Sequence, residues 1–79
     1  MMDSKQLALK FLANACDDMA EVCDKNINSL DKKKTLRDLE KEFGYLLAAI
    51  KEVTEEYKLD EQRVFANVEK EIKKRQTEL

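Results

Sequence analysis

Hydrophobic residues recur three or four positions apart along most of the chain, which is the spacing of amphipathic α-helices. The first such segment follows Asp3 and Gln6, a pair with the spacing of an N-cap and its capping box. These signals predict a first helix over residues 4–26. Its apolar face comprises Leu9, Leu12, Cys16, Met19 and Cys23, widened by Leu7, Phe11, Ala15 and Val22.

A second, longer stripe predicts a helix over residues 32–57. It follows residues 26–30 (NINSL), the least helix-favouring stretch and therefore the expected first connection. The stripe fits either a coiled-coil seam or one face of a compact bundle. We expect its single glycine, Gly44, to lie where another helix approaches closely. The apolar members are Leu36, Leu39, Phe43, Leu46, Ile50, Val53 and Tyr57.

The third segment starts at a sharper boundary. Asp60 has the position of an N-cap, and Leu59 and Val64 have the spacing of a hydrophobic staple. Apolar residues then recur to Ile72, and the segment ends in basic residues, which favour a helix C-terminus. A third helix is predicted over residues 61–76. The expected fold is all-α: a single domain over residues 1–79, built as a three-helix bundle.

The composition excludes several classes of function. The chain has no His, Trp or Pro and one Gly, which rules out Ser-His and Cys-His nucleophile pairs, histidine-containing zinc sites and glycine-rich phosphate loops. A net charge of -2 argues against nucleic acid as a partner. The basic run Lys32, Lys33, Lys34 and Arg37 is interpreted as the solvated start of the second helix.

Three further features concern location. No apolar stretch approaches the roughly 20 residues of a membrane span, and the N-terminus lacks the apolar region of a signal peptide. Cys16 and Cys23 lie two helical turns apart, about 10 Å, which is too far for a disulfide. We therefore expect free core thiols, no membrane partner and a cytoplasmic location.

The size of the chain points to self-association. A 79-residue chain buries only about 60–65% of its extended surface, so the margin of stability of a monomer is thin. Two of the predicted helices have apolar faces wider than one seam. A homodimer or higher homo-oligomer is the expected state.

Carboxylates lie beside the apolar faces. Asp17, Asp18 and Glu21 fall within two turns of the first helix, and Glu42 borders the stripe of the second. If these helices pack antiparallel, Glu42 can face Asp18 and Glu21. Like charges so placed are tolerated when a divalent cation neutralises them. The alternative is that these are ordinary solvated carboxylates, because 41% of the residues are charged.

A family resemblance favours the interpretation of these carboxylates as a metal site. Residues 17–22 (DDMAEV) and 39–45 (LEKEFGY) resemble the two metal-binding helices of the MazG-like nucleoside triphosphate pyrophosphohydrolases, whose pattern is EExxE, a spacer and ExxD. Residues 58–60, 64–65 and 72–75 resemble the family's third helix, so the likeness covers about residues 5–75. It implies an all-α dimer, or dimer of dimers, that hydrolyses NTPs or dNTPs to monophosphate and pyrophosphate with Mg²⁺.

The resemblance also assigns site residues. Asp17, Asp18, Glu21 and Glu42 correspond to metal ligands, and Lys70, Lys74 and Arg75 to phosphate-binding residues. The aspartate of ExxD is replaced by Tyr45, a poor Mg²⁺ ligand, and an expected lysine is replaced by Glu71. The first two glutamates are shortened to aspartates.

These departures predict a degenerate MazG-like protein in which catalysis is weak or lost. Mg²⁺ is the expected cofactor if the site still works, and it is lost with the site otherwise. Tyr45 then fills the emptied site, and the chain acts by binding a nucleotide or a partner protein. One alternative is an active Mg²⁺-dependent pyrophosphohydrolase that relies on Asp18, Glu21 and Glu42. A second is an unrelated helical-bundle adaptor whose seam is the stripe of the second helix.

Overall fold

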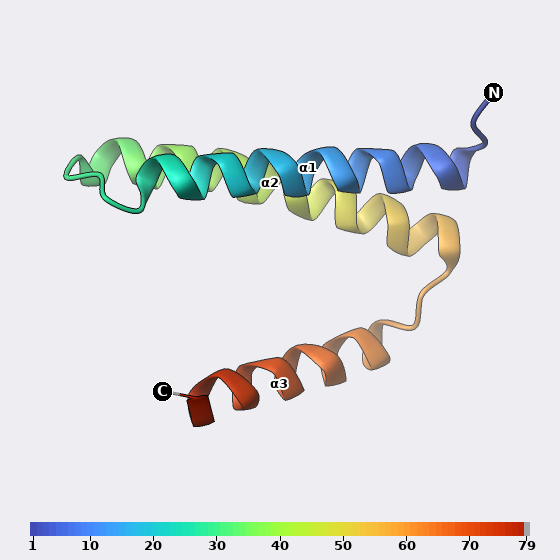
Figure 1. Cartoon of the computed structure of the whole chain (residues 1–79). Coiled ribbons are helices and arrows are strands. Elements are labelled where there is room, and N and C mark those ends of the chain that lie inside the picture. The colour runs from blue at the N-terminus through green and yellow to red at the C-terminus, as the bar shows by residue number, and fades with distance from the viewer. Residues whose placement is uncertain (79) are drawn as a thin grey trace.

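The chain forms three helices and no strand over residues 1–78, the part that the computed structural model describes. They are α1 (Ser4–Asn26), α2 (Lys32–Tyr57) and α3 (Glu61–Glu78), and their arrangement is shown in Figure 1. The all-α prediction is confirmed, and the third helix continues beyond its expected end near residue 76. Within residues 1–78, none of the helices combines the length and hydrophobicity needed to cross a lipid bilayer.

Helices α1 and α2 form an antiparallel hairpin. At its open end the Ser4 hydroxyl donates a hydrogen bond to Oε2 of Glu56, at 2.8 Å. At the closed end Thr35 Oγ1 donates to Oδ1 of Asn26, at 2.9 Å. The start of α1 therefore lies beside the end of α2, as Figure 1 shows.

Each hairpin helix begins at an aspartate. The Asp3 side chain accepts a hydrogen bond from the Gln6 amide at 2.8 Å, and the Gln6 side chain accepts one from the Asp3 amide at 3.0 Å. This is the predicted capping box. Asp31 caps α2 by accepting from the Lys34 amide at 3.0 Å. Both contacts satisfy amides that a helix N-terminus leaves without intrahelical partners.

The seam between α1 and α2 is built from small residues. The buried side chains in residues 1–78 are Ala8, Ala15, Ala49 and Val53. The prediction of the α2 stripe as a core face is therefore wrong for four of its seven members. Its covered members are Leu39, Leu46 and Val53, whereas Leu36, Phe43, Ile50 and Tyr57 are exposed. Alanines let two helices approach closely, so the contact is centred on them and the larger residues lie on its flank.

Two further expectations fail inside the chain. Cys16 and Cys23 are free thiols, but both are exposed, so they are not core residues. They lie on the part of the wide apolar face of α1 that α2 leaves uncovered. Gly44 is not a point of close helix contact either, because a Cβ built there would meet nothing within 4 Å.

Helix α3 is attached by a tight corner. Lys58 adopts a left-handed conformation (φ 51°, ψ 51°), and the Leu59 amide donates to the Thr54 carbonyl at 3.0 Å. Asp60 then caps α3, as predicted, by accepting from the Gln62 amide at 2.9 Å. Every described residue of α3 is exposed. The core thus comes from α1 and α2 alone.

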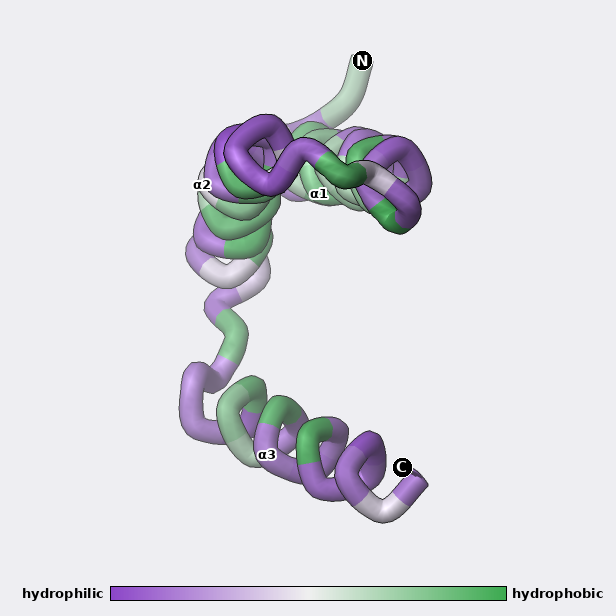
Figure 2. Tube along the Cα trace, turned by 90° about the vertical axis from the view of Figure 1, so that its left-hand side faces the viewer, coloured by the Kyte–Doolittle hydropathy of each residue, from purple (hydrophilic) through white to green (hydrophobic). Residues whose placement is uncertain are grey.

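The molecule is consequently extended. Its radius of gyration is 15.1 Å, whereas a compact domain of this length has a radius of about 11.6 Å. Figure 1 shows why: α3 runs back beneath the hairpin but stands apart from it. Figure 2 shows that the apolar parts of α3 lie on the side turned toward the hairpin.

Candidate functional site

The predicted acidic residues of α1 lie on its surface. Asp17, Asp18 and Glu21 are all exposed. The Glu21 carboxylate is paired with a neighbour on its own helix, the Lys25 ammonium, at 3.6 Å. An exposed pair of this kind stabilises a helix by a few tenths of a kcal/mol. These three side chains show the surroundings of solvated carboxylates.

Glu42 has different surroundings. It lies on the α2 face that packs on α1 and is half-buried. Its Oε2 atom is shielded from solvent and has no hydrogen-bond partner. A buried polar atom left without a partner costs about 1–3 kcal/mol. Among the predicted ligands in residues 1–78, only Glu42 therefore has a buried carboxylate oxygen that a cation or a hydrogen-bond donor would stabilise.

Tyr45 is held by an aromatic contact across the seam. Its ring centroid lies 5.3 Å from that of Phe11, with 30° between the ring planes. Pairs in this range contribute about 0.5–1.5 kcal/mol beyond the area that they bury. The position at which the resemblance expects a ligand thus carries a packing contact between α1 and α2.

The four predicted ligands do not converge. Among residues 1–78 no three acidic or cysteine side chains are grouped closely enough to hold a metal ion. The antiparallel hairpin places Glu42 opposite the α1 segment that contains Asp18, yet Asp18 stays exposed. The magnesium site stays a prediction.

The predicted phosphate-binding residues Lys70, Lys74 and Arg75 are exposed on the second half of α3. Because α3 adds no residue to the core, its basic end belongs to a separate surface from the α1–α2 seam.

A polar cluster fixes the closed end of the hairpin. Asn26 Nδ2 donates to Asp38 Oδ2 at 3.3 Å, and Lys34 Nζ donates to the same oxygen at 3.1 Å. The hydrogen bond from Asn26, then that from Lys34, holds the pKa of the Asp38 carboxyl below its usual value. The cluster ties α1 to α2 and is satisfied internally, so its role is structural.

The most extensive feature is an apolar surface that the sequence did not single out as a site. On α2 a mainly apolar groove is lined by Leu36, Leu39, Phe43, Gly44 and Leu47, together with the carboxylate residue Glu40. Leu47 and Phe43 are 62% and 53% exposed. The sequence did carry a signal for this surface: the apolar stripe of α2 is wider than one neighbouring helix can cover.

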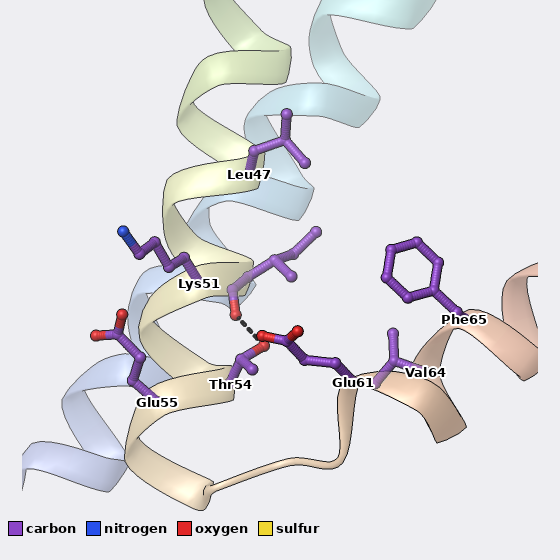
Figure 3. A pocket seen from close by; sticks show the side chains of 8 residues that line it. Leu47, Lys51, Thr54, Glu55, Glu61, Val64 and Phe65 are labelled. Carbon is purple, nitrogen blue, oxygen red and sulfur yellow. Dashed lines mark hydrogen bonds between the residues drawn. The ribbon is translucent and has the colours of Figure 1, made fainter.

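This surface continues onto α3. A hollow between the two helices is lined by Leu47, Ile50, Lys51, Thr54 and Glu55 of α2 and by Glu61, Val64 and Phe65 of α3. In Figure 3 Val64 and Phe65 of α3 lie across from Leu47 of α2, and the Glu61 side chain is directed toward α2. Phe65 is 67% exposed. The groove, the hollow and the apolar face of α3 (Val64, Phe65, Val68 and Ile72) are called the apolar surface below.

Comparisons with protein-family models, with curated proteins and with solved structures give no match. The likeness to the MazG-like family therefore rests on the sequence motifs alone, in residues 17–22, 39–45 and 58–75.

Proposed function

We propose that this chain is a binding protein: a degenerate MazG-like protein that acts by holding a partner protein on its apolar surface. The observation that carries the proposal is the exposure of large apolar side chains on α2 and α3, among them Leu47 and Phe65. Contiguous exposed apolar surface flanked by charged residues is typical of protein interaction sites. The extended shape favours an adaptor over an enzyme, and an unrelated helical-bundle adaptor stays the alternative identity of such a binding protein.

The surroundings of Tyr45 support the loss of catalysis. A phenol does not replace a carboxylate as an Mg²⁺ ligand, and this ring is engaged with Phe11 at 5.3 Å. Selection for packing at this position is the simplest physical reason for the substitution. A nucleotide stays an alternative ligand, with Lys70, Lys74 and Arg75 as its phosphate contacts.

Pyrophosphate release tests this proposal. Wild-type protein is incubated with Mg²⁺ and a panel of NTPs and dNTPs, and we expect no release above the rate in buffer. Glu42→Gln and its matched control Glu52→Gln, an exposed acid on the same helix outside the groove, are assayed in parallel. If the wild type and Glu52→Gln release pyrophosphate and Glu42→Gln does not, the proposal is overturned.

One observation favours a second function, an active Mg²⁺-dependent pyrophosphohydrolase. The buried Oε2 of Glu42 has no partner, and a bound cation would satisfy it. Isothermal titration with Mg²⁺, repeated with a non-hydrolysable triphosphate, tests this directly. Heat of binding that is present in the wild type and absent in Glu42→Gln supports the enzyme. Equal heats in the two proteins count against it.

A further inference from the structure

We infer that the partner on the apolar surface is a second copy of this chain, and that α3 of each copy packs in the α2 groove of the other. The groove is the one lined by Leu36, Leu39, Glu40, Phe43, Gly44 and Leu47. This inference rests on the proposed function, because it names the partner of the same surface.

The exposed area fits a dimer. A compact monomer of 9.2 kDa exposes about 4900 Å², whereas this chain exposes 7007 Å². The excess is roughly 2100 Å² per chain. A pair of chains that covers it buries about 4200 Å² in total, which lies in the range of obligate homodimers.

Nothing within its own chain covers helix α3. It has 18 residues and none of them is buried. Most helix stability in proteins comes from packing an apolar face. The apolar side of α3 is turned toward the hairpin but stands apart from it (Figures 1 and 2). This face is therefore open to a helix of another molecule.

The α2 groove matches that face in length and chemistry. Leu36 to Leu47 spans three turns, about 16 Å, and Val64 to Ile72 spans about 12 Å. Gly44 lies in the groove, and a Cβ there would meet nothing within 4 Å inside the chain. A glycine in the middle of a helix is less favourable than alanine. Close approach of a helix from another chain would explain why a glycine stands at this position.

Charge and symmetry are consistent with reciprocal docking. Residues 61–78 carry five basic and four acidic side chains, whereas residues 1–60 carry ten basic and thirteen acidic ones. The two parts thus have opposite net charge, which favours contact between α3 of one copy and the hairpin of the other. A two-fold axis repeats the contact and closes the dimer.

Molar mass in solution is the first test. Light scattering is expected to give twice the 9.2 kDa of one chain for the wild type. Phe65→Ser is expected to give the mass of one chain, while circular dichroism still reports the hairpin helices. Asn67→Ser, an exposed polar position on α3, is the matched control and keeps the wild-type mass.

Disulfide trapping is the second test and locates the contact. In a Cys16→Ser, Cys23→Ser background, chains with Phe43→Cys are mixed with chains with Val68→Cys and oxidised. These positions lie near the middle of the groove and of the α3 face, so they meet whichever way α3 runs. We expect a mixed covalent dimer in high yield, and little when Glu69→Cys replaces Val68→Cys.

A wild type with the mass of one chain overturns the inference. So does a dimer that survives Phe65→Ser, or trapping that is equal for Val68→Cys and Glu69→Cys. The proposed function fails separately, through pyrophosphate release. A dimer of the expected geometry with Glu42-dependent turnover keeps the inference and overturns the proposed function, and an inactive monomer does the reverse.

Discussion

At the scale of single residues, Tyr45 is the position where a packing role and a metal-binding role can be told apart. Its ring contacts Phe11 across the seam, and it follows Glu42, whose buried oxygen lacks a partner. Replacing Tyr45 by aspartate removes the ring contact and puts a second carboxylate on the same face. We expect Tyr45→Asp to lower the free energy of unfolding by about 2 kcal/mol, measured by urea denaturation in the absence of Mg²⁺.

Tyr45→Phe is the control, because it keeps the ring and removes only the hydroxyl. It is expected to unfold close to the wild type. If Tyr45→Asp is as stable as the wild type, the aromatic contact has no structural role and the degenerate interpretation loses its physical basis.

Asp38 gives a pH dependence with a defined sign. Its pKa is held below the usual 3.8, first by the hydrogen bond from Asn26 and then by that from Lys34. A carboxyl whose pKa is lower in the folded than in the unfolded state stabilises the fold above the unfolded pKa. That stabilisation is lost as the pH falls through the folded pKa.

We therefore expect Asp38→Asn to melt below the wild type at pH 7. The difference in Tm is expected to shrink as the pH falls below the usual 3.8 and to vanish once it is below the lowered pKa of the folded state. Thermal melts followed by circular dichroism over this range measure it. The exposed Asp24, changed to asparagine, is the control and is expected to leave Tm unchanged at pH 7. A difference in Tm that grows on acidification contradicts the assignment.

At the scale of elements, the corner between α2 and α3 is strained by one residue. Lys58 has a φ of 51°, where a side chain costs about 1 kcal/mol and glycine costs nothing. Lys58→Gly is expected to raise Tm by about 4–8 °C. Lys58→Ala keeps the strain and separates this effect from loss of the charge. An equal rise in both variants contradicts the strain.

The helix boundaries could be predicted because their signals are local. Asp3, Gln6 and Asp60 lie within three residues of the amides that they cap, so spacing alone identifies them. The left-handed Lys58 carries no such signal, because lysine is not a residue that favours this conformation.

The seam could be predicted only in part. A three-and-four spacing defines an apolar face but not which side of it meets the neighbouring helix. Here the contact between the helices is centred on Ala15 and Ala49, so Phe43 and Ile50 lie on its exposed flank. Small side chains contribute little to a hydrophobic pattern, although they decide how closely two helices pack.

The candidate site depends on the whole molecule, which is why the sequence missed it. The wide stripe indicated surplus apolar surface, but not that α3 would leave the groove at Leu47 uncovered. That outcome follows from the direction of the chain after Lys58. A set of acids was easier to propose from spacing, yet convergence of Asp18 and Glu42 needs side-chain directions that spacing does not give.

Gly44 supplies a prediction in which two effects have opposite signs. Gly44→Ala is expected to stabilise the isolated chain by about 1 kcal/mol through helix propensity, since the new Cβ meets nothing within 4 Å. The same Cβ obstructs a helix that packs in the groove. The dissociation constant of the dimer, from sedimentation at several concentrations, is expected to rise about tenfold. Tighter or unchanged association contradicts the docking of α3 at this glycine.

Hydrogen exchange of the α3 amides tests most directly whether the apolar surface is an interface. At protein concentrations that favour the dimer, we expect the amides around Phe65 and Val68 to be protected as strongly as those of α2, and to lose this protection on dilution or in Phe65→Ser. Exchange of α3 at the rate of an unfolded peptide at every concentration, with α1 and α2 protected, would mean that nothing covers this surface.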